Sequence, residues 1–215
     1  MRMDFSERCV VSAFSQPRQT DAVAHAQWQW LELDEMEGVR STCIVQLAPD
    51  SHLELPCHGS GEELFILDGH LSDTLGDYGP GTFIKNAPGS SLTPYSRSGC
   101  TLFVKQGHLD ERDQSRVVID SAGATWRPGL VSGLSVLPLH EFITQHTAMV
   151  RWAPETCFST HRHYGGEEIL VLDGVFEDEH GHYPAGTWIR SPHLSQHQPF
   201  SHEGCLILVK VGHLA

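Results

Sequence analysis

The stretch Glu63-Leu-Phe-Ile-Leu-Asp-Gly69 occurs a second time, in closely similar form, as Glu168-Ile-Leu-Val-Leu-Asp-Gly174. Each copy is a short apolar run that ends in Asp-Gly, a strong signal for a β-strand followed by a hairpin turn. The two copies lie 105 residues apart. The same strand motif is therefore used twice, which indicates an internal repeat.

The repeat extends well beyond this strand. A shift of 105 residues aligns residues 43–110 with residues 148–215 without a gap, and 26 of the 68 aligned positions are identical. Both copies consist of short apolar segments separated by turns rich in glycine and proline, and neither shows a helical period. This pattern is typical of a barrel or sandwich, so we predict an all-β protein with two similar domains. The polar stretch 110–116 indicates a linker, which places the domains at residues 1–112 and 113–215.

Composition and charge exclude several classes of function. The net charge of −13 argues against a nucleic-acid surface, because binding to phosphates needs clustered Lys and Arg. No apolar run approaches the roughly 18 residues of a membrane span. The N-terminal residues lack the apolar segment and cleavage site of a secretory signal, so we expect a cytoplasmic protein. The six cysteines are dispersed without a C-x-x-C pair, which indicates reduced thiols.

The positions at which the two copies differ point to a metal site in the second domain. His161, His163, Glu167 and His197 correspond, at the 105-residue shift, to Pro56, His58, Glu62 and Leu92. On a β-strand, His161 and His163 leave the same face, and the turn that follows them brings Glu167 onto a neighbouring strand. His197 lies beyond the next turns, on a strand that can return to the same place.

Three imidazoles and one carboxylate suit Zn²⁺, Fe²⁺, Mn²⁺ or Ni²⁺ and leave a coordination position open. We therefore expect one divalent metal per chain, held by His161, His163, Glu167 and His197. No side chain can be assigned as a catalytic acid or base from the sequence.

The first domain has lost part of this set. Pro56 and Leu92 cannot coordinate a metal, and His58 and Glu62 alone rarely hold one. We expect His58 and Glu62 to hydrogen-bond one another in a metal-free pocket. In the second domain, we expect His180, His182, His193 and His202 to be solvated, with His193 the one best placed to line the pocket instead.

The motif His161-x-His163-x3-Glu167-x6-Gly174, followed by Pro184-Ala185-Gly186, resembles the cupin superfamily. The late histidine, His197, together with GGEEILVLDG, DEHGHYPAGTWIR and EGCLILVK, resembles in particular the cupin domain of ChrR-type anti-sigma factors. The resemblance covers most of residues 126–215 and, in degenerate form, 28–110. It implies two tandem cupin barrels, that is, a double-stranded β-helix repeated twice. It also places the family's zinc ligands on His161, His163, Glu167 and His197.

Three functions are compatible with this resemblance, one of them that of an isomerase or a purely structural bicupin. ChrR-type proteins hold an extracytoplasmic-function sigma factor inactive and release it under oxidative stress, which implies a sensory, zinc-binding role and a protein partner such as a sigma factor. Their sigma-binding module carries an H-x3-C-x2-C zinc motif, and these 215 residues contain none. The alternative is a cupin dioxygenase that uses Fe²⁺ to cleave a small ketone or diketone. Zinc is the expected ion, and exposed strand edges favour a homodimer.

Overall fold

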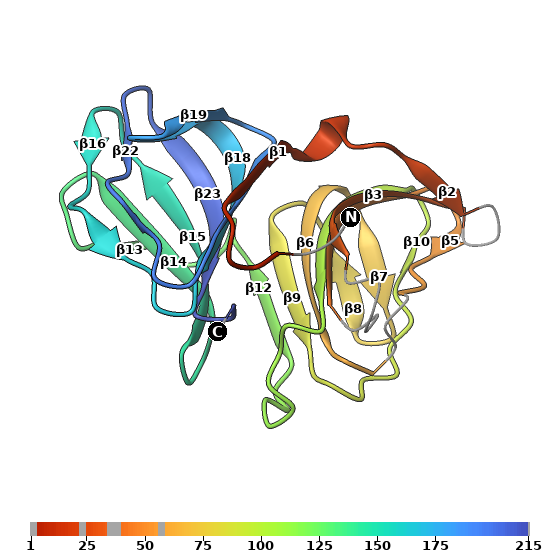
Figure 1. Cartoon of the computed structure of the whole chain (residues 1–215). Coiled ribbons are helices and arrows are strands. Elements are labelled where there is room, and N and C mark those ends of the chain that lie inside the picture. The colour runs from red at the N-terminus through yellow and green to blue at the C-terminus, as the bar shows by residue number, and fades with distance from the viewer. Residues whose placement is uncertain (1–3, 22–24, 34–39, 56–58, 215) are drawn as a thin grey trace. The chain divides into compact units, whose positions relative to one another are not determined.

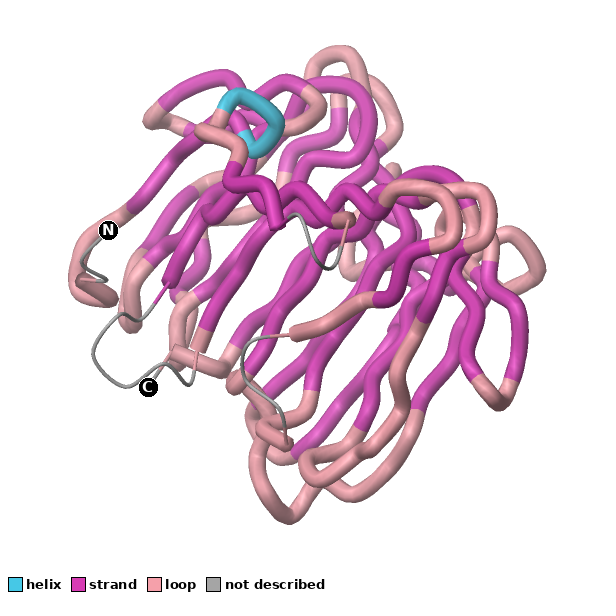
Figure 2. Tube along the Cα trace, turned by 90° about the vertical axis from the view of Figure 1, so that its right-hand side faces the viewer, coloured by secondary structure: helices cyan, strands magenta, loops and turns pink. Residues whose placement is uncertain are grey.

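The computed structural model describes residues 4–21, 25–33, 40–55 and 59–214. They form two compact units, one of residues 13–124 and one of residues 4–12 together with residues 125–215 (Figure 1). Nearly all regular structure is strand (Figure 2), and the one helix described, η1 (Ala13–Ser15), has three residues. None of the helices in the described ranges is long and apolar enough to cross a membrane. The predicted all-β fold with two tandem barrels is confirmed.

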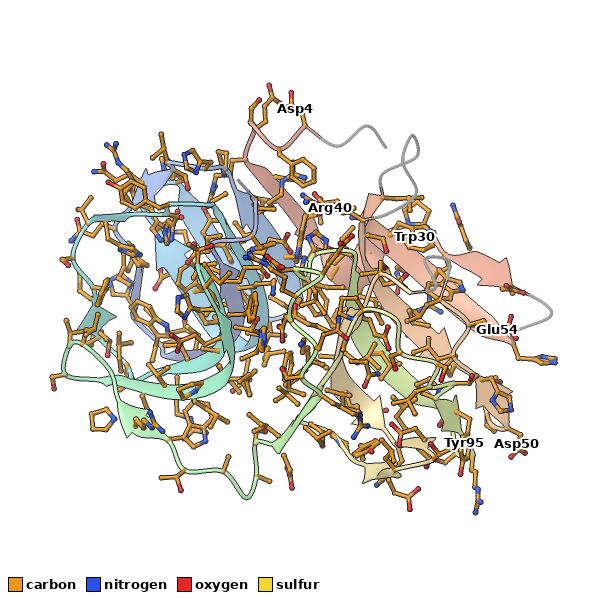
Figure 3. The ribbon with its side chains drawn as sticks, turned by 90° about the horizontal axis from the view of Figure 1, so that it is seen from below. Asp4, Trp30, Arg40, Asp50, Glu54 and Tyr95 are labelled. Atoms are coloured by element: carbon orange, nitrogen blue, oxygen red, sulfur yellow. The ribbon has the colours of Figure 1, made fainter. Side chains whose placement is uncertain are left out.

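The first unit contains two sheets. The larger has the strand order β12-β9-β6-β11-β4-β3-β2 and the smaller β5-β10-β7-β8. In the smaller sheet Tyr95 pairs with His52, and the Asp50 amide donates to the Arg97 carbonyl, so Tyr95 and Asp50 lie together (Figure 3). The strands are β2 (Gln19–Asp21), β3 (Ala26–Leu33), β4 (Ser41–Leu47), β5 (Ser51–His52), β6 (Glu62–Gly69), β7 (Leu71–Asp73), β8 (Gly76–Tyr78), β9 (Thr82–Asn86), β10 (Tyr95–Ser96), β11 (Cys100–Gln106) and β12 (Val117–Asp120).

The second unit repeats this topology. Its larger sheet runs β1-β20-β18-β23-β15-β14-β13, and β16, β22, β19 and the C-terminal half of β18 form the counterpart of the smaller sheet. A further pair, β17 with β21, has no counterpart among the described residues of the first unit. The strands are β1 (Cys9–Ser12), β13 (Arg127–Pro128), β14 (Leu134–Phe142), β15 (Gln145–Trp152), β16 (Thr156–Cys157), β17 (His161–Arg162), β18 (Glu167–Asp178), β19 (Gly181–Pro184), β20 (Thr187–Ser191), β21 (Gln196–His197), β22 (Phe200–Ser201) and β23 (Cys205–Val211).

The two repeats exchange their first strands. β1, at the start of the first repeat, pairs with β20 of the second unit, and β12, at the start of the second repeat, pairs with β9 of the first unit. The compact units therefore differ from the predicted division into residues 1–112 and 113–215. The predicted boundary follows the covalent repeat, whereas hydrogen bonding assigns each edge strand to the barrel that it extends.

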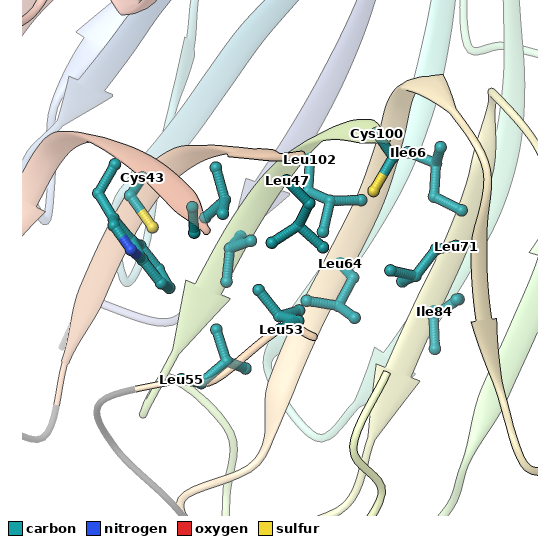
Figure 4. Packing of buried hydrophobic residues seen from close by; sticks show 14 of the residues in the cluster. Cys43, Leu47, Leu53, Leu55, Leu64, Ile66, Leu71, Ile84, Cys100 and Leu102 are labelled. Atoms are coloured by element: carbon teal, nitrogen blue, oxygen red, sulfur yellow. The ribbon is translucent and has the colours of Figure 1, made fainter. Parts of the chain in front are cut away.

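An apolar core fills the first barrel. Alternate residues of the central strands, such as Leu64 and Ile66 on β6 and Leu102 on β11, meet Leu53 and Leu71 from the opposite sheet (Figure 4). Alternation places these side chains on one face of each strand. Full burial of such a side chain stabilises the fold by about 1.5–3 kcal/mol relative to exposure. The barrel is thus stabilised by a packed apolar interior.

Gly174 ends the first half of β18 with φ +70°, and a Cβ there would lie 2.1 Å from the carbonyl oxygen of Gly204. We expect Gly174→Ala to destabilise the chain by at least about 2 kcal/mol, because the left-handed conformation alone costs about 1–2 kcal/mol for a non-glycine residue. Thermal unfolding measures the loss. Gly123→Ala is the matched control, because no atom lies within 4 Å of the added Cβ. Equal melting temperatures for the two variants would contradict the prediction.

Candidate metal centre

The local fold brings the four predicted ligands together. β17 and β21 pair with His161 opposite His197, and His163 follows β17 directly. Gly165 and Gly166, with φ of +80° and +71°, then turn the chain into β18, which starts at Glu167. The turn needs glycine, because a Cβ on Gly165 would lie 2.6 Å from the Cα of Gly212. The sequence predicted this meeting of the four side chains, and the structure shows it.

The side-chain atoms converge on one point. The Nε2 atoms of His163 and His197 are 2.9 Å apart, and Oε2 of Glu167 lies 3.5 Å from the first and 3.6 Å from the second. The His161 ring centre is 4.6 Å from that of His163 and 5.0 Å from that of His197. Ligand atoms held at about 2.0–2.1 Å from one tetrahedral zinc ion lie about 3.3 Å apart. The observed separations bracket this value.

The remaining ring nitrogens of two histidines have acceptor partners. Nδ1 of His161 lies 3.0 Å from the Ser159 carbonyl oxygen, and Nδ1 of His197 lies 3.4 Å from Oδ2 of Asp178. Since a carbonyl or carboxylate only accepts, each Nδ1 carries the proton and each Nε2 presents its lone pair to the centre. This tautomer is the one that a metal requires.

Glu167 shows that the group suits a cation. Its Oε2 is buried and has no hydrogen-bond partner among the described residues. A buried carboxylate oxygen without a donor is costly unless a cation satisfies it. The donor set of three imidazoles and one carboxylate fits a divalent transition metal.

Burial changes the protonation of the cluster in the metal-free chain. Burial, together with the neighbouring His197 and His161, lowers the pKa of His163 to about 3. Burial raises the pKa of Glu167 to about 7, although the charge of His197 opposes this shift. His163 is therefore neutral at physiological pH, ready to bind a metal, and a bound cation would restore the charge of Glu167.

The equivalent place in the first barrel has only part of the set. His58 and Pro56 lie outside the described residues, so the expected His58–Glu62 hydrogen bond stays a prediction. Oε1 of Glu62 accepts a hydrogen bond of 2.7 Å from Nδ2 of Asn86. Leu92 occupies the position of His197 and offers no ligand atom.

The other histidines of the second domain lie outside the centre. His180, His182 and His202 are exposed, as predicted. His193 is also exposed, as expected of this set, and does not line the pocket; its Nδ1 accepts from the Gly165 amide at 2.9 Å. It therefore stabilises the turn before Glu167. Asp178 and Arg8, which bind one another beside His197, were not predicted.

An apolar cavity of about 190 Å³ adjoins the centre. His161, Glu167 and His197 form part of its wall, and the rest is apolar, including Val136, Trp152, Phe158 and Ile207. No lysine or arginine of the described chain lines it. The cavity suits a small apolar molecule that reaches the metal position with one or two oxygen atoms.

Known protein families include one that matches each of the two repeats separately. A family model described as the ChrR cupin-like domain matches residues 10–110 and again residues 114–215. The chain belongs to this ChrR cupin-like family. The match makes it a tandem pair of cupin domains, as the sequence predicted, and metal binding is typical of the fold. No curated protein matches the sequence.

Solved structures similar to this ChrR cupin-like protein show the same fold at low identity. A candidate dioxygenase from Nostoc punctiforme has a TM-score of 0.79 and 12% identity, with 96% of this chain and 82% of that chain covered. A candidate glyoxylate-induced protein from Pseudomonas aeruginosa has a TM-score of 0.76 and 15% identity, covering 98% and 91%. An oxalate decarboxylase from Lactobacillus farciminis, in complex with formate, has a TM-score of 0.64 and 13% identity, covering 96% and 86%.

Proposed function

We propose that the second barrel binds one divalent metal ion through His161, His163, Glu167 and His197, and that it serves as a zinc-dependent sensory module acting with a protein partner. The observation that carries the metal assignment is the grouping of the His161, His163 and His197 ring nitrogens, with a buried Glu167 oxygen 3.5–3.6 Å from two of them and without a hydrogen bond among the described residues. The family match covers both repeats, and the sensory role is our inference from the resemblance to ChrR-type proteins. The first barrel then serves as a metal-free scaffold.

A metal in this centre would supply a Lewis acid with a position open to ligand. The chain's own residues prepare the place for it. Ser159 and Asp178 hold the Nδ1 protons of His161 and His197, so that both Nε2 lone pairs face inward. On the cavity side, the centre is bordered by apolar side chains such as Trp152 and Phe158.

A second candidate function is supported by the cavity itself. A metal-dependent dioxygenase acting on a small ketone or diketone needs an apolar chamber beside the metal, and the cavity provides one. The activity named for the Nostoc structure agrees with this alternative. A dicarboxylate such as oxalate is less suited, because the described lining offers no basic side chain to pair with a second carboxylate.

Metal analysis of the full chain, purified without added metal, separates the two functions. We expect one zinc ion per chain, and no uptake of O₂ when small ketones or diketones are added. Both results follow from a zinc site, because zinc has no redox chemistry. Stoichiometric iron with ketone-dependent O₂ uptake would overturn the sensory proposal and establish the dioxygenase. Absence of any bound metal, even after incubation with Zn²⁺ or Fe²⁺, would overturn both.

A further inference from the structure

Asp178, the last residue of β18, is a buried carboxylate that binds four different groups. Its Oδ1 accepts from the Tyr183 hydroxyl at 2.7 Å and from the His180 amide at 2.8 Å. Its Oδ2 accepts from Nη2 of Arg8 at 2.9 Å and lies 3.4 Å from Nδ1 of His197. The side chain is only 1% exposed. Asp178 therefore has a fixed orientation, and one of its oxygens faces a candidate metal ligand.

Arg8 and Tyr183 form the clamp that fixes this carboxylate. Arg8 precedes β1, whose pairing with β20 anchors the N-terminal segment to the second barrel. The Arg8 guanidinium donates to the Tyr183 hydroxyl at 2.8 Å as well as to Asp178, and it lies 5.2 Å from the centre of the Tyr183 ring. Contacts from two elements thus restrict the carboxylate to one position.

The first barrel contains the same clamp without the histidine. Nη2 of Arg116 lies 2.6 Å from Oδ2 of Asp73 and 2.9 Å from the Tyr78 hydroxyl, and this hydroxyl donates to Asp73 at 2.9 Å. Leu92 occupies the position of His197. The Arg–Asp–Tyr clamp is therefore a feature of the barrel, and the contact with His197 is an addition found where the candidate metal ligands are complete.

We propose that Asp178, held by Arg8 and Tyr183, is the positioning residue that fixes the ring and the tautomer of His197 for metal binding. The inference rests on the proposed metal function of the same centre. An ionised carboxylate accepts the Nδ1 proton, which leaves the Nε2 lone pair pointing at His163 and Glu167. Carboxylates that bind the second nitrogen of a ligating histidine typically change metal affinity 10–100-fold when they are altered.

Asp178→Asn tests the proposal, and Asp73→Asn is its matched control. The asparagine keeps the size of the side chain, but its amide can donate to Nδ1 of His197 and favour the wrong tautomer. We expect titration of the metal-free full-length chain with Co²⁺ to show about 10–100-fold weaker binding for Asp178→Asn. Asp73→Asn should weaken its own clamp, because one accepting oxygen becomes an amide nitrogen, but keep the Co²⁺ affinity within about twofold, because Asp73 belongs to the other barrel.

The tautomer can be measured without any metal. Nitrogen-15 NMR of histidine-labelled, metal-free chain should show His197 protonated at Nδ1 in the wild type and in Asp73→Asn. In Asp178→Asn this form should lose population to the Nε2 tautomer. A merely structural role for Asp178 would lower the melting temperature and leave this spectrum unchanged.

The two readouts separate the two proposals. Unchanged Co²⁺ affinity and an unchanged tautomer in Asp178→Asn would overturn the positioning role and leave the metal site standing. A wild type that binds no metal but has His197 fixed at Nδ1–H would overturn the metal function and retain the positioning. If Asp178→Asn does not fold, Arg8→Lys replaces it, with Arg116→Lys as control. Lysine keeps the charge but lacks the planar guanidinium whose Nη2 contacts both Asp178 and Tyr183, so a smaller loss of affinity is expected.

Discussion

Replacement of His197 by alanine will weaken zinc binding by about 70- to 900-fold. Four-ligand zinc sites bind with about 10–16 kcal/mol, so one ligand's share is about 2.5–4 kcal/mol. We expect the full loss of one ligand because His197 is buried and its Nε2, 2.9 Å from that of His163, points into the candidate metal centre. Competition of the full chain with a zinc chelator measures both affinities. His161→Ala should behave in the same way.

The first barrel provides the control for this prediction. His58→Ala, at the position equivalent to His163, should leave zinc stoichiometry and affinity unchanged, because Pro56 and Leu92 offer no further ligand atoms. Two zinc ions per wild-type chain, or a His58→Ala variant with reduced binding, would show that the first barrel also holds metal.

Zinc should also raise the melting temperature of the wild type and not that of His197→Ala. A ligand at a concentration of 100 Kd stabilises the folded state by about 2.7 kcal/mol. In a chain of this size each kcal/mol shifts the melting temperature by roughly 2–4 °C. An equal shift in both proteins would mean that zinc binds elsewhere.

The candidate ligand set could be predicted because the duplication provides a comparison within one chain. Fold-determining residues such as Gly69 and Gly174 are kept in both copies, whereas His161 and His197 face Pro56 and Leu92. Short spacing explains the rest: three residues separate His163 from Glu167, so a tight turn is enough to bring them together. The strands themselves followed from their apolar runs and Asp-Gly turns.

The Arg8–Asp178 pair that holds His197 could not be predicted in the same way. Arg8 and Asp178 are 170 residues apart in the chain, and no local pattern links them. Their counterparts are Arg116 and Asp73, which means that the arginines are offset by 108 residues and the aspartates by 105. A gap-free alignment at 105 residues misses the arginine pair. The pairing of β1 and β12 with their barrels could not be predicted either, because a sequence pattern indicates that a segment is a strand but not which strand it pairs with.

The cavity depends on a difference between the two repeats, in which Trp28 of the first corresponds to Val136 of the second. Trp28 pairs with Val45 on β4, and Val136 pairs with Val150 on β15, so Trp28 and Val136 occupy equivalent positions. Trp28 is buried in the first core and stacks on Trp30, with ring centres 5.2 Å apart. Val136 lines the cavity beside the metal position. At equivalent positions, the large Trp28 side chain is thus packed into the first core, whereas the small Val136 side chain borders the cavity of the second barrel.

Val136→Trp should therefore close the cavity without removing the metal. In the Co²⁺-loaded wild type, a small diketone is expected to change the visible absorption spectrum, because it can reach the open position through the apolar chamber. Val136→Trp should keep its Co²⁺ affinity and lose most of this response, since a tryptophan ring covers about 150–250 Å² of apolar surface. Overpacking costs about 1–3 kcal/mol, so Val136→Phe provides a smaller blocking side chain if the tryptophan variant does not fold.

The opposite change, Trp28→Val in the first barrel, tests whether a chamber without a metal site gives any diketone response. Trp28→Val should open space in the first barrel and destabilise it by an amount approaching the roughly 3–5 kcal/mol of a buried Trp→Ala change. It should produce no second metal-linked response, because Leu92 replaces the ligating histidine there.

An undiminished diketone response in Val136→Trp would mean that ligands reach the metal by another route. In that case the apolar cavity would be a packing feature of the second barrel, and a small-molecule reaction at this centre would lose its main structural support.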